Sequence, residues 1–173
     1  MSLAPPPLRI LIVGGGPAGT FAAIAAKKQN PSAAVTLLTS ERCEPYEKPP
    51  LSKAVLLGTR HAADAPIAGP AGLSSHGVHV ETGAEARAID RISRTVLLGD
   101  GRPLPYDALV LATGAIAREI PQLPKGTPRV HYLRNEADAA HLKAALDGSR
   151  SVLIVGAGLI GLEVAASAAT LGL

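Results

Sequence analysis

The sequence predicts a three-layer α/β fold in which parallel strands alternate with helices and an antiparallel meander is inserted. Residues 8–13 (LRILIV) form a nearly continuous apolar run that stops at a glycine cluster, and residues 151–155 (SVLIV) repeat this pattern. Such runs are typical of parallel strands covered on both faces. Between the two copies, short segments over residues 78–113 are separated by glycines and prolines, which predicts the meander.

The elements that follow the first strand can be predicted in order. The Ala-rich residues 17–29 form a helix, because proline is tolerated in a first turn and Asn30-Pro31 ends the pattern. Residues 34–38 form the second strand. Pro49-Pro50 followed by LSKAVLLG predicts a short helix that opens on a proline-stiffened loop.

The meander is expected from four segments, VHVE, EARAID, TVLL and DALVLAT, of which the last leads into a buried strand. Gly83, residues 99–101 and residues 103–105 separate them. Residues 121–128 read as a proline-interrupted connection. A helix over residues 135–146 follows, and an Ala-rich helix is expected after the second glycine cluster.

The composition excludes several classes of protein. The 173 residues are 47% hydrophobic, with a formal charge of +3 and 18% charged residues, and neither basic runs nor aromatic platforms accompany that charge. We therefore expect no nucleic-acid partner. No apolar stretch is long enough for a membrane span, so we expect a cytoplasmic protein without a membrane partner. Cys43 is the only cysteine and the histidines show no ligand spacing, so no metal site or dithiol is expected.

The first glycine cluster has the spacing Gly14-x-Gly16-x-x-Gly19 between a strand and a helix. In a Rossmann-like unit the first glycine permits a tight turn, the second admits a pyrophosphate, and the third lets the helix pack on the strand. The helix N-terminus supplies amide dipoles for the anion. The alternative is an ordinary turn in which the glycines serve chain reversal alone.

An acidic residue is expected at the end of the second strand to bind a ribose. Ser40 and Glu41 both compete for this role, and we favour Glu41, because a carboxylate accepts hydrogen bonds from ribose hydroxyls and repels a 2′-phosphate. This favours FAD or NAD over NADP at the first loop. The alternative for Glu41 is a solvated surface acid.

The second glycine cluster, Gly156-x-Gly158-x-x-Gly161, follows the second apolar run in the same way. Two such loops imply two dinucleotides. A flavin and a nicotinamide in one protein make a hydride relay, because the nicotinamide reduces the flavin, which can release electrons singly or in pairs.

Four motifs together resemble the FAD-dependent pyridine nucleotide-disulfide oxidoreductase superfamily. They are GGGPAG at residues 14–19, PYEKPPLSK at 45–53, YDALVLATG at 106–114 and VGAGLIGLE at 155–163. Within it, the chain is most similar to the ferredoxin and rubredoxin reductases of oxygenase systems, with relatives of the apoptosis-inducing-factor type. PPLSK is the most discriminating motif, because the glycine loops are shared across the superfamily.

The resemblance implies the N-terminal part of a reductase. The N-terminal part of its FAD-binding domain would span residues 8–120, and a connection and helix would occupy residues 121–148. Residues 149–173 would form the start of an NAD(P)-binding domain. The implied activity passes hydride from NAD(P)H to FAD and electrons onward to a ferredoxin- or rubredoxin-type acceptor. The alternative is a truncated, non-catalytic nucleotide-binding or interaction fragment. A flavin-dependent monooxygenase is less consistent with PPLSK.

The resemblance also implies roles for individual residues. Lys53 of PPLSK would lie beside the flavin and form an ion pair with Glu163 near flavin N5, and these two are the expected catalytic residues; the alternative for Lys53 is a surface residue that caps a helix. The residues expected to bind the cofactors are Gly14, Gly16, Pro17, Ala18, Gly19, Ser40, Glu41, Arg42, Lys53, Ala86, Ala112, Thr113, Gly114, Arg134, Gly156, Gly158 and Gly161. Ala86 could instead fill a strand, and Arg134 could be a solvated charge.

Three positions depart from the family pattern. Lys48 replaces the usual arginine before PPLSK, which changes geometry more than charge. Residues 115–118 (AIAR) replace the Arg-Pro pair that follows ATG in many relatives. Cys43 does not match the redox cysteine of the disulfide-reducing branches, so we expect an incidental thiol.

Overall fold

The computed structural model describes residues 6–173, which form two compact units. The first unit contains the chain up to residue 46 together with residues 66–114. The second contains residues 47–65 and 115–173. The predicted domain boundaries place residues 47–65 in the first domain, whereas this segment packs with residues 115–173; the boundaries themselves stay predictions.

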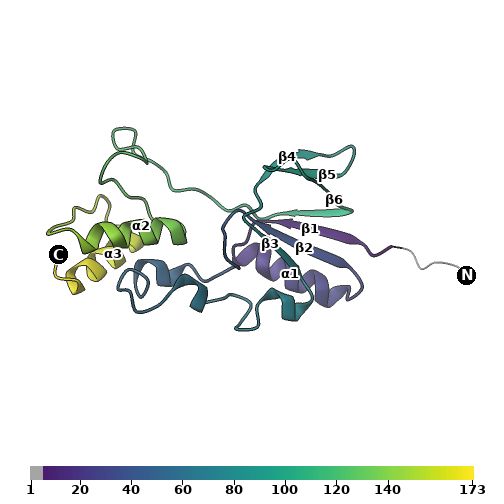
Figure 1. Ribbon diagram of the computed structural model, residues 1–173, viewed down its shortest axis with the longest axis horizontal. Helices are drawn as coiled ribbons and strands as arrows, with labels where there is room; N and C mark the ends of the chain where they lie inside the picture. Colours follow the sequence, from purple (N-terminus) through teal and green to yellow (C-terminus); the bar gives the residue numbers. More distant parts are fainter. Residues whose placement is uncertain (1–5) are drawn as a thin grey trace, which may run out of the picture. The chain divides into compact units, whose positions relative to one another are not determined.

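The first unit is built on a four-stranded parallel sheet with the order β3-β2-β1-β7 (Figure 1). Its strands are β1 (Arg9–Val13), β2 (Ala34–Thr39), β3 (His79–Thr82) and β7 (Ala108–Leu111). Helix α1 (Pro17–Gln29) connects β1 to β2; the bounds of the helix agree with prediction, and those of each strand differ from it by one residue at one end. This parallel α/β arrangement confirms the predicted fold class.

The second sheet of this unit is the antiparallel meander, with the order β4-β5-β6. It contains β4 (Ala86–Asp90), β5 (Thr95–Leu98) and β6 (Pro103–Pro105). The prediction was wrong in assigning VHVE to the meander, because those residues form β3 and pair in parallel with β2. It was also wrong in treating residues 103–105 as a separator, because Leu104 pairs opposite Val96.

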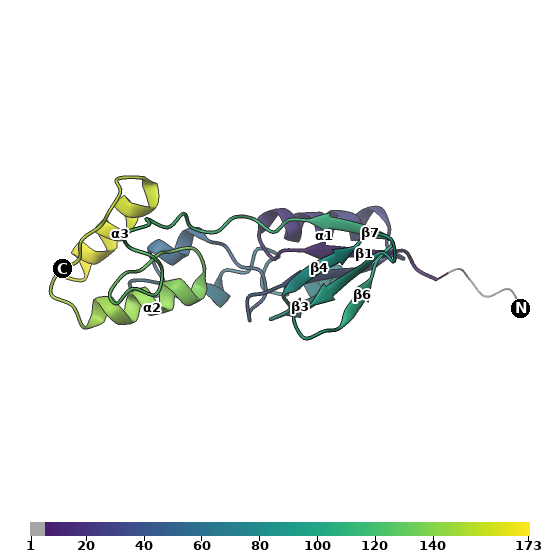
Figure 2. The same cartoon turned by 90° about the horizontal axis from the view of Figure 1, so that it is seen from above.

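Two hydrophobic clusters make the first unit three-layered, with α1 on one face of the parallel sheet and the meander on the other (Figures 1 and 2). Ile12 and Leu37 pack with Ala23 of α1. Leu11 and other residues of the opposite face pack with Val96 of the meander. Alternate residues of β1 therefore enter different clusters, which explains why its sequence is apolar without interruption.

Strand β7 was predicted to be buried, and this prediction was wrong. It pairs with β1 only, and it stands at the edge of the sheet. Leu111 is 60% exposed. The apolar run predicted burial correctly for β1 and β2, which have a neighbouring strand on each side, and failed where the second neighbour is missing from the described residues.

An ion pair ties the start of β7 to the start of β1. The Arg9 guanidinium donates to both carboxylate oxygens of Asp107, at 3.0 Å from Nε and 2.7 Å from Nη2, and the Arg9 amide donates to Oδ2 at 2.8 Å. The Asp107 amide returns a bond to the Arg9 carbonyl at 2.9 Å. The bonds from the side chain and then the amide of Arg9 hold the pKa of Asp107 well below its usual range.

The second unit is helical. It contains the short 3₁₀ helices η1 (Pro49–Ser52) and η2 (Ala62–Asp64) and the α-helices α2 (Glu136–Asp147) and α3 (Leu159–Thr170). A third 3₁₀ helix, η3 (Leu73–His76), belongs to the first unit. The helix predicted after Pro49-Pro50 is thus confined to η1, and turns follow it.

Helix α2 lies one residue later than the predicted range of 135–146, and Asn135 is its N-cap. The Asn135 side chain accepts a bond from the Asp138 amide at 2.9 Å, and the Asp138 carboxylate accepts from the Asn135 amide at 3.2 Å. This capping box satisfies donors that the first helical turn would otherwise leave unpaired. Leu142 and Leu146 then pack with Leu56 and with Val164 of α3, which forms the core of this unit.

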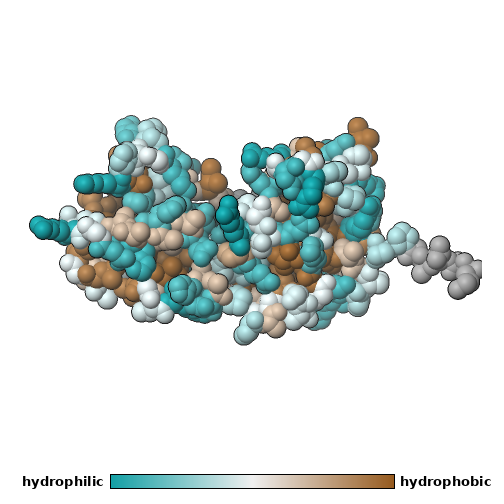
Figure 3. All heavy atoms as spheres, viewed as in Figure 1, coloured by the Kyte–Doolittle hydropathy of each residue, from teal (hydrophilic) through white to brown (hydrophobic). Residues whose placement is uncertain are grey.

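The strand predicted over residues 151–155 is not formed, so this prediction was wrong. Leu153 is 88% exposed and Val155 is 63% exposed. A strand needs a neighbour that accepts its backbone hydrogen bonds, and no strand of residues 6–173 pairs with this segment. Hydrophobic atoms are correspondingly visible on the surface over the second unit (Figure 3).

Replacing Leu37 with alanine tests whether the middle of β2 is buried against α1. Leu37 is fully buried between α1 and the sheet, so Leu37→Ala should lower the free energy of unfolding by about 2–5 kcal/mol. Leu111→Ala on the exposed edge strand is the matched control, with an expected change within about 0.5 kcal/mol. Urea unfolding measures both, and equal losses for the two variants would contradict the described packing.

The Arg9–Asp107 pair predicts a pH-dependent stability. Because the pKa of Asp107 is depressed in the folded state, its contribution is present above the unfolded value of about 3.9 and is lost as pH falls through the folded value. Asp107→Asn should therefore be less stable than wild type at neutral pH, and the difference should shrink as pH falls below about 4. Thermal unfolding across this range measures it, and a difference independent of pH would contradict the assignment.

Candidate functional site

The first glycine loop lies at the carboxyl edge of the parallel sheet. Gly14 has φ +119°, a conformation that L side chains rarely adopt, and a Cβ there would collide with the Ala112 carbonyl oxygen. Its amide donates to the Leu38 carbonyl at 2.8 Å, while the Ala112 amide donates to the Val13 carbonyl at 2.8 Å. The loop is therefore held between the ends of β2 and β7.

The other two glycines of this loop have the separate roles that the spacing predicts. A Cβ on Gly19 would collide with the Gly14 carbonyl oxygen, so its absence lets α1 pack on the strand end. Gly16 is the N-cap of α1, and a Cβ there would meet nothing within 4 Å. Pro17 and the exposed Ala18 follow in the first helical turn, which contains no acidic residue. Open space therefore faces the positive end of a helix dipole.

Glu41 follows β2 at the same edge and is half-buried. The Tyr46 hydroxyl donates to Glu41 Oε2 at 2.5 Å, and the Gly83 amide donates to the Glu41 carbonyl at 2.8 Å. The position of Glu41 is thus fixed by its neighbours, which does not fit the solvated-acid alternative. Ser40 and Arg42 are exposed beside it. Tyr46 was not predicted as part of this region, because nothing in its local sequence indicates contact with Glu41.

Three further predicted residues of the first unit have structural surroundings that leave their roles untested. Ala86 in β4 is partly buried and packs against the cluster that includes Val96, which fits the alternative that it fills a strand. Thr113 and Gly114 follow β7, and Gly114 has φ +71°. At Gly114 the chain leaves the edge of the sheet at which Gly14 also lies. Their contacts with a cofactor stay predictions.

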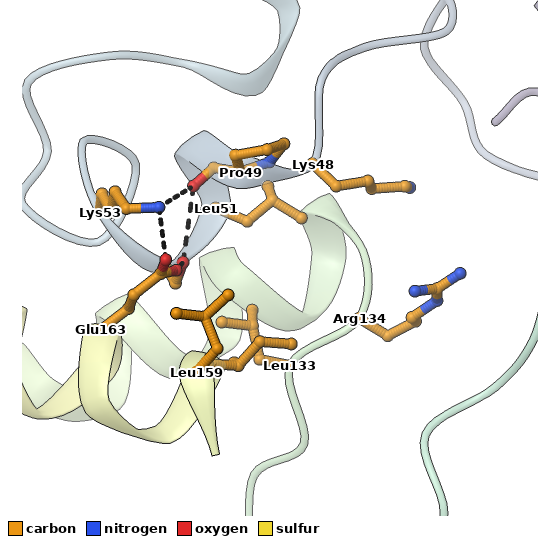
Figure 4. Close-up of a pocket in the computed structure, with 10 residues that line it drawn as sticks. Lys48, Pro49, Leu51, Lys53, Leu133, Arg134, Leu159 and Glu163 are labelled. Atoms are coloured by element: carbon orange, nitrogen blue, oxygen red, sulfur yellow. Dashed lines mark hydrogen bonds and ion pairs between the residues drawn. The ribbon is translucent and has the colours of Figure 1, made fainter. Parts of the chain in front are cut away.

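The predicted ion pair between Lys53 and Glu163 is present in the second unit (Figure 4). Lys53 Nζ lies 2.7 Å from Glu163 Oε1 and also donates to the Pro49 carbonyl at 3.4 Å. The Ser52 hydroxyl donates to the other oxygen of Glu163. The bonds from Lys53 and then Ser52 lower the pKa of Glu163, which keeps this carboxylate ionised.

A pocket of about 220 Å³ lies beside this ion pair. Its apolar wall comes from the 3₁₀ helix, the segment before α2 and the start of α3; these residues are Leu51, Leu133, Leu159 and Ile160. Lys48 and Arg134 add positive charge to the lining. Figure 4 shows the ion pair at one side of the pocket and Arg134 at the other. The pocket therefore joins an apolar wall to a charged edge at Lys53 and Glu163.

The second glycine loop has the conformation of the first. Gly156 has φ +113°, and a Cβ on Gly161 would collide with the Gly156 carbonyl oxygen, just as Gly19 would with Gly14. Gly158 is the N-cap of α3, with open space around its missing side chain. The loop and helix are therefore formed even though the segment before them does not pair as a strand.

Comparison with known proteins agrees with this duplicated geometry. The family model described as pyridine nucleotide-disulphide oxidoreductase matches residues 8–173. The chain belongs to this family.

Two family relatives show how much of a longer protein the chain spans. The ferredoxin–NAD(+) reductase component of the p-cumate 2,3-dioxygenase system of Pseudomonas putida is 39% identical, with 94% of this chain and 40% of that protein covered. Rhodocoxin reductase of Rhodococcus erythropolis is 37% identical, with 96% of this chain and 39% of that protein covered. The chain spans about 40% of the length of these relatives.

Solved structures of the family have the same fold. The covalent putidaredoxin reductase–putidaredoxin complex matches with a TM-score of 0.82 and 34% identity, over 94% of this chain and 40% of that one.

Among the helices of the described chain, none is long and apolar enough to span a bilayer. Residues 6–173 also contain no group of three or more histidine, cysteine or acidic side chains arranged for a metal ion.

Paired alanine substitutions distinguish packing from open space in the first loop. Gly19→Ala should lower the free energy of unfolding by about 1–3 kcal/mol, because its Cβ has to displace the Gly14 carbonyl. Gly16→Ala should cost less, about 0.5–1 kcal/mol, because its Cβ meets no atom and only the N-cap preference for glycine over alanine is lost. Chemical denaturation measures both, and a loss at Gly16→Ala larger than that at Gly19→Ala would show that the surroundings of Gly16 are occupied by protein.

Proposed function

We propose that this chain is part of an FAD-dependent NAD(P)H oxidoreductase that passes electrons to a ferredoxin- or rubredoxin-type acceptor. The observation that carries the proposal is the repeated loop geometry, with Gly14, Gly16 and Gly19 matched by Gly156, Gly158 and Gly161. Two loops of this kind in one chain supply pyrophosphate positions for two dinucleotides. The predicted boundaries at residues 120 and 148 are part of this proposal.

The residues of the first unit fit FAD. The open space at Gly16 lets a pyrophosphate approach the backbone, and the amides at the start of α1 would donate to it. Glu41, fixed by Tyr46 at the end of β2, would accept hydrogen bonds from the ribose hydroxyls. When bound, FAD would supply the conversion of two-electron hydride transfer into one-electron transfer.

The second unit contributes the candidate tuning residues. Lys53 is half exposed next to the pocket, and its ion pair with Glu163 holds its ammonium group in place. A cation at the edge of the pocket would favour electron density on the ring system of the cofactor. Residues 156–161 at the start of α3 would hold the nicotinamide dinucleotide through the same amide geometry as the first loop.

The names of the relatives support the identity of the acceptor. The p-cumate relative is a ferredoxin–NAD(+) reductase component, and the solved structure pairs putidaredoxin reductase with putidaredoxin. We therefore propose a small electron-carrier protein as partner. The fold, pocket and ion pair of this chain call for no general acid or base, since orientation and electrostatics suffice for such a relay.

A second candidate is a nucleotide-binding fragment that does not turn over. The unpaired residues 151–155, with Leu153 88% exposed, favour it for this chain by itself, because the strand that should support the second loop lacks a partner. Both candidates bind a nucleotide, and only the reductase then transfers electrons.

The test is a titration of the purified apoprotein with FAD, followed by an assay of NADH-dependent dye reduction. Saturable binding with dye reduction supports the reductase, and saturable binding without it supports the nucleotide-binding fragment. Gly16→Ala should weaken FAD binding about tenfold or more, because a Cβ would occupy the space of the pyrophosphate, while the protein stays folded. Absence of binding at saturating FAD would overturn the FAD proposal for this chain.

A further inference from the structure

Ser52 lies between the two partners of the ion pair, and both of its polar groups are engaged. It is buried at the end of η1, directly before Lys53. Its hydroxyl donates to Glu163 Oε2, and its carbonyl accepts a bond from the Ser167 hydroxyl at 2.7 Å. Ser167 is itself buried. A buried serine that satisfies two partners on one helix holds a single orientation.

The two partners of Ser52 belong to the same face of α3. Glu163 and Ser167 are four residues apart in the helix, so their side chains project from neighbouring turns of one face. The side chain of Ser52 contacts the first and its backbone contacts the second. The 3₁₀ helix is thereby fixed against α3 at the residue that precedes Lys53.

The contacts of Glu163 divide between its two carboxylate oxygens. Lys53 takes Oε1 and Ser52 takes Oε2, so rotation of the carboxylate breaks one of the two bonds. Glu163 is the only charged residue of α3, and besides it and Lys53 the charged residues that line the pocket are Lys48 and Arg134. After Lys53, Ser52 is the next contributor to the lowered pKa of Glu163.

We propose that Ser52 is a positioning residue, locked by Ser167, that fixes the Glu163 carboxylate and through it the Lys53 ammonium. The inference rests on the proposed function, in which this pair lies beside the flavin. In that setting Ser52 would keep the lysine charge at one place relative to the second glycine loop, because Gly158 and Glu163 belong to the same helix.

The first measurement is the titration of Glu163 in the apoprotein by ¹³C NMR of its carboxyl carbon, identified by its absence in Glu163→Gln. Ser52→Ala should raise the pKa of Glu163 towards its ordinary value, since one bond to the ionised form is lost. Ser167→Ala should move it in the same direction by less, because the Ser52 hydroxyl remains but is no longer held. Ser52→Thr, which restores a hydroxyl, should return the pKa towards wild type.

Ser149→Ala is the matched control. Ser149 also donates its hydroxyl to a backbone carbonyl, that of Ala145 at 2.7 Å, but it lies on the exposed end of α2. It should leave the titration of Glu163 unchanged. A folded Ser52→Ala protein with the wild-type pKa at Glu163 overturns the proposal; if Ser52→Ala does not fold, an unchanged pKa in Ser167→Ala overturns it.

A second measurement monitors Lys53 itself. Acetylation rates of individual lysines, read by mass spectrometry, should rise for Lys53 in Ser52→Ala and stay constant for Lys125 and Lys143, which pair with Asp138 and Asp147. A general loosening of the fold would raise all three rates and overturn the positioning role. Both measurements use protein without flavin, so failure of FAD binding contradicts the proposed function while these results still decide the role of Ser52.

Discussion

The close approach of α1 to the end of β1 is the constraint on which the rest of the first unit depends. Gly19 allows it, because a Cβ there would collide with the Gly14 carbonyl, and Gly14 in turn lies against the Ala112 carbonyl after β7. A side chain at position 19 would move the helix N-terminus away from the sheet edge, and one at position 14 would separate the loop from the end of β7. The amides at the start of α1, Ala112 after β7 and Glu41 after β2 therefore lie at one edge of the sheet.

The sequence predicted most of the parallel α/β layer because each of its signals is local. An uninterrupted apolar run, a glycine spacing and an Ala-rich segment ended by Asn30-Pro31 together specify β1, the loop and α1 to within one residue. Partner choice was not predictable in the same way. VHVE has the pattern of a meander strand but pairs with β2, since strand pairing depends on where the chain returns in space. Residues 151–155 show the converse case, in which a strand pattern has no strand to pair with.

The residues of the candidate site also differ in whether a local sequence signal predicts them. The conformation of the glycine loops and the position of Glu41 after β2 could be predicted from the spacing, and the Lys53–Glu163 ion pair from the family resemblance. Tyr46 and Ser167 could not, since a tyrosine after Pro45 and a serine in an Ala-rich helix carry no signal of the residues that they contact. Ser52 belongs to a recognised motif, but its two contacts become visible only when η1 and α3 are placed together.

The position of β7 at the edge of the sheet affects more than burial. Its inner row of backbone groups bonds to β1, while no described strand pairs with its outer row of N–H and C=O groups. An open edge of this kind is a template for strand addition, and natural proteins protect such edges with charge, bulges or a covering segment. Within β7 itself (ALVL) no side chain is charged, and the charged Arg9–Asp107 pair lies only at its N-terminal end. Whether this chain stays monomeric or associates through added strands therefore depends on whether another segment covers the outer edge of β7.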